Sequence, residues 1–230
     1  MRVALFGATG RAGGAILRQG HAARHQIHAL VRVPGSLAGE PPDVAVTVGD
    51  VRDAGAVERV MAGADAVVSA IGGTRASNLA VLEQGTASIL AVMRRDSVRR
   101  LIVVQGFHLP FPGDPGGVGR PLMAAMLRAW NQRLSRDTYR MADLLRASDL
   151  DWTLIRMPRL VEGPPGDDYR VGRLALGPWS TVTTGQVGHF TLSCLADGDF
   201  SRDAPMVAAA RAGRDSPSSR RAEAEHERLP

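Results

Sequence analysis

Short apolar runs alternate along this chain with segments whose apolar residues recur at helical spacing. Such runs predict strands buried on both faces of a parallel sheet, and they lie at 2–7, 25–32, 44–50, 65–73, 99–106 and 151–157. The amphipathic segments between them predict helices, at 10–22, 53–64, 78–95 and 121–147. This alternation favours an α/β fold, a Rossmann-type doubly wound parallel sheet.

The pattern is less regular towards the C-terminus. A helix is predicted at 185–197, between short strands near 169–174 and 204–209. Residues 106–120 are rich in Gly and Pro, which predicts a loop beyond the end of a strand, where ligands of such sheets bind. Ser, Pro and alternating charge dominate residues 211–230, so a disordered tail is expected there.

The composition suits one domain. With 230 residues, of which 44% are hydrophobic, the chain can bury one sizeable core. We therefore expect a single domain over 1–210, with a small C-terminal region on the substrate side, formed mainly by 106–120 and 157–190.

Charge and apolar run length exclude several functions. The net charge of +5 is spread along the chain without a basic and aromatic array, so no nucleic-acid partner is expected. No apolar run reaches the ~18 residues of a membrane helix, and the first residues lack a signal segment. The lone Cys194 cannot form an internal disulfide, which fits a cytoplasmic protein. No cluster has metal-ligand spacing, so no metal is predicted.

A glycine-rich turn follows the first predicted strand. Gly7, Gly10 and Gly13 form G-x-x-G-x-x-G and open the first helix. Gly7 permits a tight turn, Gly10 lets backbone approach a pyrophosphate, and Gly13 lets helix and strand pack closely. The helix N-terminus adds unpaired N–H groups and a positive dipole end. The position and spacing predict a dinucleotide site.

The ends of the next strands refine this site. Arg32 ends the second strand where an NAD site usually has an acid, and an arginine suits the 2′-phosphate of NADP. After the third strand, Asp50 is a candidate acceptor for an adenine amino group and Val51 for packing on the ring, while Asp53 is the better helix cap. Arg75 follows the fourth strand as a candidate phosphate ligand.

The segments "GATGRAGG", "LVR", "GDVRD" and "AIGGTR" together resemble the atypical short-chain dehydrogenase/reductase superfamily. The runs "RMADLLRASDLDWTLIRMPRL" and "GQVGHFTLSCL" are similar to its subgroup containing flavin reductase/biliverdin-IXβ reductase and the NmrA-like proteins. The resemblance implies a dinucleotide site made of Gly7, Thr9, Gly10, Arg11, Ala12, Gly13, Arg32, Asp50, Val51, Ile71, Gly72, Arg75 and Pro158. It also implies that Gln105 and Gly106 lie beside the nicotinamide, although family reductases often carry Ser or Thr there.

The usual acid of such reductases is absent. Tyr139 is followed four residues later by Asp143, where the common catalytic pair has Lys, and all 28 basic residues of the chain are Arg. A carboxylate would raise the pKa of the phenol, so it cannot replace Lys. The helical stripe places Asp143 about opposite the apolar face. The stripe consists of Met123, Leu127, Trp130, Leu134, Met141 and Leu145.

The candidate catalytic residues are then His108, Tyr139 and His189. His108 lies in the loop over the nicotinamide end, where it either donates to substrate or faces water. His189 sits among apolar helix residues, which favours a core histidine, although the resemblance implies that it lines the pocket. A catalytic role of Tyr139 conflicts with the missing Lys.

An intact cofactor site without the usual acid indicates acceptors that delocalise the arriving charge. We expect an NADPH-dependent reductase of a flavin, a quinone or another conjugated aromatic small molecule, acting as a monomer or homodimer. The arginine-only usage suggests a G+C-rich bacterium, and by association natural-product (antibiotic) biosynthesis. The alternatives are a non-catalytic NmrA-like NADP sensor and a ketoreductase or epimerase that uses His108 as its acid.

Overall fold

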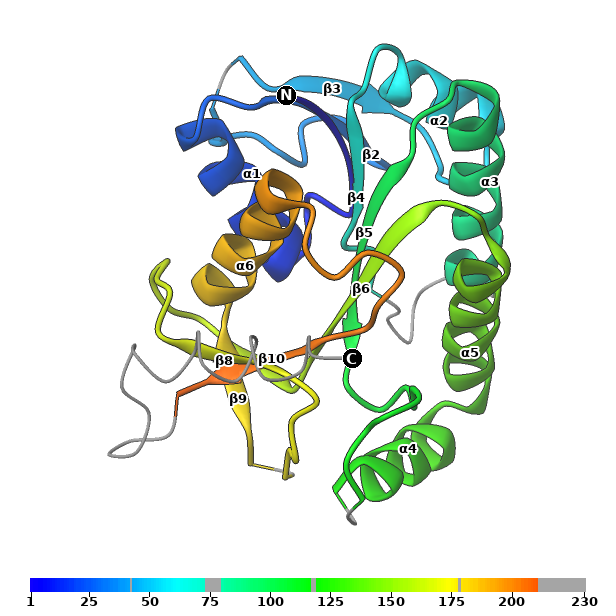
Figure 1. The fold of residues 1–230 in the computed structure, drawn as a ribbon. Helices are drawn as coiled ribbons and strands as arrows, with labels where there is room; N and C mark the ends of the chain where they lie inside the picture. The colour runs from blue at the N-terminus through cyan, green and yellow to red at the C-terminus, as the bar shows by residue number, and fades with distance from the viewer. Residues whose placement is uncertain (42, 73–79, 117–118, 178, 211–230) are drawn as a thin grey trace.

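The computed structural model describes residues 1–41, 43–72, 80–116, 119–177 and 179–210. Its centre is an eight-stranded sheet in the order β3-β2-β1-β4-β5-β6-β10-β8, with every neighbouring pair parallel except β10 and β8 (Figure 1). The strands are β1 (Arg2–Phe6), β2 (Gln26–Val31), β3 (Ala45–Val48), β4 (Ala66–Ser69), β5 (Arg100–Gly106), β6 (Asp151–Met157), β8 (Tyr169–Gly172) and β10 (Met206–Ala209). The predicted doubly wound parallel sheet is confirmed.

Helices cover both faces of this sheet. One face carries α1 (Arg11–Ala22) and α6 (Thr184–Asp197), which pack on each other. The other face carries α2 (Ala54–Met61), α3 (Val81–Arg95) and α5 (Gln132–Ala147) (Figure 1). Within the described ranges, none of the helices combines enough length and apolarity to cross a membrane.

Two hydrophobic cores follow from the alternation of side chains along the strands. In β1, Ala4 and Phe6 belong to the core beneath α2, α3 and α5, whereas Val3 and Leu5 belong to the core beneath α1 and α6. Successive strand residues point to opposite faces, so a continuous apolar run is needed when both faces are covered. The apolar runs of the sequence therefore correspond to the central strands.

The single helix predicted over 121–147 is wrong. The chain forms α4 (Gly119–Trp130) and α5, separated at Asn131. Asn131 has φ −153° and ψ 87°, and its side chain accepts a hydrogen bond from the Leu134 N–H, which caps α5. The stripe is broken accordingly, because Trp130 is 51% exposed while Met141 and Leu145 are buried.

Two short strands were not predicted. β7 (Arg159–Val161) and β9 (Thr181–Thr183) pair in parallel as a separate two-stranded sheet. Each has only three residues, which is too few for an apolar periodicity to mark it. β9 leads directly into α6, whose start is fixed by a capping box between Thr183 and Gln186.

Candidate dinucleotide and acceptor site

The turn after β1 has room only for glycine at two positions. Gly7 has φ +86°, and a Cβ added there would lie 2.5 Å from the Ala70 carbonyl oxygen. A Cβ on Gly13 would lie 2.0 Å from the Gly7 carbonyl oxygen. The first contact brings β1 against the end of β4, and the second brings α1 against the turn. Both match the packing roles expected from the glycine spacing.

The N-terminus of α1 has free hydrogen-bond donors. Its N-cap is Gly10, without a capping side chain, and no acidic residue lies in the first turn. The backbone N–H groups of Arg11, Ala12 and Gly13 have no partner among the described residues. Unsatisfied N–H groups at the positive end of a helix form an anion site.

The N-termini of other helices near this site are capped by side chains. Asp53 accepts from the Gly55 N–H and caps α2, as expected. At α3, the cap comes from another element, because the Asp137 carboxylate of α5 accepts from the Leu82 N–H (2.9 Å) and the Glu83 N–H (2.8 Å). Of these three helices, α1 is therefore the one open to a phosphate.

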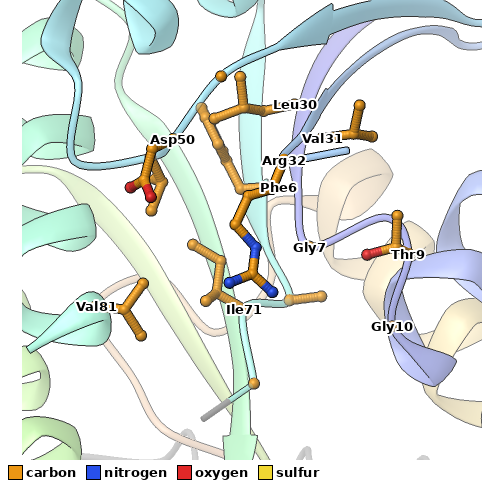
Figure 2. Close-up of a pocket in the computed structure, with 14 residues that line it drawn as sticks. Phe6, Gly7, Thr9, Gly10, Leu30, Val31, Arg32, Asp50, Ile71 and Val81 are labelled. Atoms are coloured by element: carbon orange, nitrogen blue, oxygen red, sulfur yellow. The ribbon is translucent and has the colours of Figure 1, made fainter. Parts of the chain in front are cut away.

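A cavity of about 300 Å³ lies beside the glycine turn, at the ends of β1, β2 and β4 (Figure 2). Eight of the residues predicted to bind the dinucleotide line it, and they are Gly7, Thr9, Gly10, Arg32, Asp50, Val51, Ile71 and Gly72. Phe6, Leu30, Val31, Gly49, Ala70 and Val81 complete the lining. Arg75 lies outside the described residues.

One part of the cavity wall is apolar. Val51 is buried, and a Cβ on Gly85 of α3 would come within 2.7 Å of its Cγ1, so Gly85 leaves the space that Val51 occupies. Val81 and Ile71 also line the cavity (Figure 2). Aliphatic walls with a carboxylate at the rim suit a flat, partly polar ring such as adenine.

Arg32 provides the positive charge of the cavity. Its side chain extends into the middle of the cavity, with the guanidinium near Ile71 (Figure 2). Among the described residues, no hydrogen bond or ion pair engages this guanidinium. A phosphate would therefore meet a cation that has no competing partner.

Asp50, by contrast, is already engaged. Its Oδ1 accepts from the backbone N–H and the Nε of Arg52, and its Oδ2 accepts from Arg52 Nη2 at 2.7 Å. These hydrogen bonds lower the pKa of Asp50 to about 2, and the charge of Arg32 acts in the same direction. The carboxylate remains ionised, but its nearest donor is part of the chain.

Several predicted binding residues lie beside the cavity and support it. Arg11 donates to Glu162 Oε1 (2.7 Å) and to the Leu160 carbonyl (2.9 Å), which joins the start of α1 to the β7 segment. The Gln105 amide donates to the Ile71 carbonyl at 2.9 Å and holds the end of β4. Ala12 and Pro158 are buried and do not line the cavity.

The structure brings two of the catalytic candidates together at the end of β5. The rings of His108 and Tyr139 meet edge-on, with centroids 6.5 Å apart. His108 is 8% exposed, and burial lowers its pKa to about 4. It is therefore a neutral imidazole at physiological pH, which counts against an imidazolium acid.

The other two residues singled out by the sequence lie elsewhere. His189 does not line the cavity, and its Nδ1 is 2.9 Å from the Tyr169 hydroxyl of β8, in a packed cluster of rings. Asp143 is 71% exposed at its side chain and pairs with Arg146. The expectation that Asp143 faces solvent is confirmed.

A buried ion pair between β6 and the segment after β5 was not predicted. Arg156 of β6 is 0% exposed and pairs with Asp114, which lies in the segment after β5. Arg156 also donates to the Leu109 and Ala204 carbonyls. The sequence carried one signal, because an arginine inside an otherwise apolar strand needs a buried partner. Its partner in a loop had no pattern to identify it.

The arrangement fits an NAD(P) dinucleotide, since the glycine turn, the open helix and the cavity adjoin one another. Three solved structures share the fold. A Rossmann-fold NAD(P)-binding family protein from Shigella flexneri is 20% identical (TM-score 0.69; 94% of this chain, 97% of that one). ChuY, an anaerobillin reductase from Escherichia coli O157:H7, is 17% identical (TM-score 0.74; 94% and 100%). A short-chain dehydrogenase/reductase from Veillonella parvula in complex with NADP is 19% identical (TM-score 0.69; 92% and 95%).

Residues 7–198 match a protein-family model described as NAD(P)H-binding. This range contains the glycine turn and every residue that lines the cavity except Phe6. The chain therefore belongs to the NAD(P)H-binding family.

Proposed function

We propose that the protein is an NADPH-dependent reductase that transfers hydride to a conjugated aromatic acceptor, a quinone or a flavin. The observation that carries this proposal is a cavity lined by eight of the predicted dinucleotide residues, in a chain that lacks the Tyr–Lys pair. The residue four positions after Tyr139, where the common pair has its lysine, is Asp143, which is 71% exposed at its side chain and pairs with Arg146.

The preference for NADP rests on Arg32 and Asp50. Arg32 is free to pair with a 2′-phosphate, whereas the Asp50 carboxylate of the same cavity is held by Arg52 and is not available to a 2′-hydroxyl. The open N-terminus of α1 is the place for the diphosphate, since its N–H groups have no partner in the described part of the chain. When bound, NADPH supplies the hydride, and these residues orient it.

The choice of acceptor follows from the missing acid. Reduction of a simple ketone needs a proton donor for the new alkoxide. A quinone or flavin spreads the arriving charge over its own rings and can take the proton from water. The neutral, buried His108 fits this class better than it fits acid catalysis of ketone reduction.

The test is oxidation of NADPH by the purified protein with menadione, with FMN and with a simple ketone. We expect turnover with menadione or FMN and little with the ketone, followed as loss of the reduced-nicotinamide absorbance. NADP binding without NADPH oxidation by any acceptor would contradict the proposal and favour an NmrA-like sensor. Turnover confined to the ketone would favour the ketoreductase alternative.

A place in bacterial natural-product biosynthesis is part of the same proposal and rests on amino-acid usage alone. It predicts that the acceptor is a polycyclic quinone rather than a free flavin. Comparison of kcat/KM for FMN, menadione and an anthraquinone tests that preference, and an enzyme selective for FMN contradicts it.

A further inference from the structure

Gly106, the last residue of β5, has no side chain, and another residue fills the place of one. A Cβ added to Gly106 would lie 2.8 Å from Nδ1 and 3.2 Å from Cε1 of His108. The imidazole of His108 is thus folded back over the strand end. Nδ1 of residue 108 thus lies too close to that Cβ position for a side chain at 106 and the ring to keep these places together.

The burial of this ring is chemically unusual. His108 is 8% exposed, and its Nε2 is buried without a hydrogen-bond partner among the described residues. The contact recorded for the ring is the edge of Tyr139 rather than a carboxylate. A buried polar atom left without a partner costs about 1–3 kcal/mol. Such a group in a native protein calls for a functional reason.

The two ring nitrogens differ in their surroundings, which bears on the tautomer. Orphaned buried N–H groups are rarer than under-satisfied acceptors. A neutral imidazole whose Nε2 is buried without a partner is therefore better accommodated with its proton on Nδ1. That nitrogen is the one beside Gly106. His108 then presents an N–H group at the strand end.

We propose that His108 takes over the role of a side chain at position 106 and donates a hydrogen bond from Nδ1 to a carbonyl oxygen of the acceptor. This inference rests on the proposed function and narrows the substrate class to acceptors whose carbonyl is conjugated with the position that receives the hydride, as in quinones. Gly106 is required because any side chain there would displace the ring.

This hydrogen bond stabilises the negative charge that develops on the acceptor, and no proton leaves the protein. In the overall reaction a quinone, NADPH and one proton give a hydroquinone and NADP⁺. The acceptor gains the hydride with its electron pair, negative charge develops on the carbonyl oxygen, and water supplies the proton. His108 keeps its own proton and stabilises that oxygen as a neutral donor. A neutral imidazole can polarise a carbonyl in this way.

The first experiment observes the imidazole directly, without turnover. The protein is labelled with ¹⁵N-histidine, saturated with NADP⁺ and titrated with menadione, and the His108 signals are assigned with a His108→Phe variant. We expect a neutral ring protonated at Nδ1, and a change of its Nδ1 signal at saturating menadione. A proton on Nε2, or an Nδ1 signal that does not change, overturns the proposal.

The second experiment moves the hydrogen-bond donor from position 108 to position 106. His108→Phe should lower kcat/KM for menadione by about ten- to hundredfold, as expected for loss of a donor to developing charge, whereas His108→Asn should retain most of it. Gly106→Ser alone should lower both activity and the melting temperature because it collides with the ring. Combined with His108→Ala, the serine has room, and its hydroxyl should restore activity above that of His108→Ala alone.

Each outcome has a separate meaning. If none of the acceptors supports NADPH oxidation by the wild-type protein, the proposed function fails. The NMR titration then still tests the hydrogen bond. If the wild-type protein is active and His108→Phe, correctly folded, keeps its kcat/KM for menadione, the function stands and the role of His108 is wrong. Additive effects of the two substitutions on stability would show that the ring does not occupy the place of a side chain at 106.

Discussion

At the scale of single residues, the proposed preference for NADP depends on two charged side chains that line the cavity. Arg32 reaches into the cavity without a protein partner, and Asp50 is neutralised locally by Arg52. The same two positions were singled out from the sequence, because each follows a strand directly. The hydrogen bonds from Arg52 to Asp50 were not predicted. A contact between residues i and i+2 depends on the conformation of the local turn.

Replacing Arg32 tests the cofactor preference. Arg32→Ala should lower kcat/KM for NADPH by about ten- to hundredfold, since a charge-assisted hydrogen bond contributes about 1.5–3 kcal/mol, and should leave the value for NADH nearly unchanged. The control is Arg94→Gln, an exposed arginine on α3 away from the cavity. Equal losses for NADPH and NADH would contradict the role of Arg32 in binding a 2′-phosphate.

His108 should make stability depend on pH in the acidic range. Its pKa in the folded protein is about 4, below the ordinary value of 6.5, because burial disfavours the charged ring. The unfolded chain therefore takes up a proton first as the pH falls. The free energy of unfolding is unaffected by this group above 6.5 and decreases as the pH falls towards 4, by about 3 kcal/mol at most.

Urea unfolding at about pH 7 and about pH 5 measures this effect. The wild-type protein should lose more stability between the two pH values than His108→Phe does. The pKa values of His25 and His28 are also lowered by burial, so part of the decrease will remain in the variant. Equal decreases in the two proteins would show that His108 is not buried as a neutral ring.

At the scale of elements, the position of His108 depends on the contacts that hold the segment after β5 in place. The Arg156–Asp114 pair, with the hydrogen bond from Arg156 to the Leu109 carbonyl, fixes that segment to β6. The guanidinium of Arg156 lies over the ring of Phe111, with its Cζ 5.0 Å from the ring centroid. These contacts place His108 over the end of β5 as much as its own position in sequence does.

Removing one partner of this pair should be costly. Asp114→Asn should lower the free energy of unfolding by about 3–5 kcal/mol, because it leaves the Arg156 charge buried without its counterion. The combined variant Asp114→Leu/Arg156→Met should regain part of that loss, since it removes both charges. Chemical denaturation of the three proteins measures both effects. A loss below about 1 kcal/mol for Asp114→Asn would indicate an ion pair open to solvent.

The elements themselves were largely predictable because burial on both faces leaves continuous apolar runs. The break at Asn131 was not, since the apolar spacing continues across it and the helix ends only because Asn131 caps the next one. The closeness of His108 and Tyr139 was not predictable either. It results from contact between α5 and the segment after β5, which no local pattern encodes.

At the scale of the whole molecule, the strand order places the cavity where a doubly wound sheet reverses direction. β1 lies between β2 and β4, so the chain leaves β1 towards one side and later returns to the other. Ligands of such sheets bind at the carboxyl ends of the strands at this point. The doubly wound class followed from the alternation of strands and helices, and the strand expected near 169–174 is β8. The β7–β9 pair had too few residues to be recognised.

Binding should stabilise the molecule as a whole. At a concentration of 100 Kd a ligand specific for the folded state adds about 2.7 kcal/mol, so NADP⁺ should raise the melting temperature. NAD⁺ at the same concentration should raise it less, and Arg32→Ala should abolish the difference. Thermal unfolding with each nucleotide measures this, and equal shifts for NAD⁺ and NADP⁺ in the wild-type protein would be the contrary result.

The cap that Asp137 provides for α3 has a consequence for the direction in which a dinucleotide would lie. The carboxylate occupies N–H groups at the start of α3, and Asp53 does the same for α2, so α1 alone among these three helices can receive the diphosphate. A dinucleotide held at its middle by α1, with its adenosine end drawn to Arg32, has one polarity available. In the proposed complex its other half extends across the sheet towards β5, so the two ends of the ligand do not exchange places.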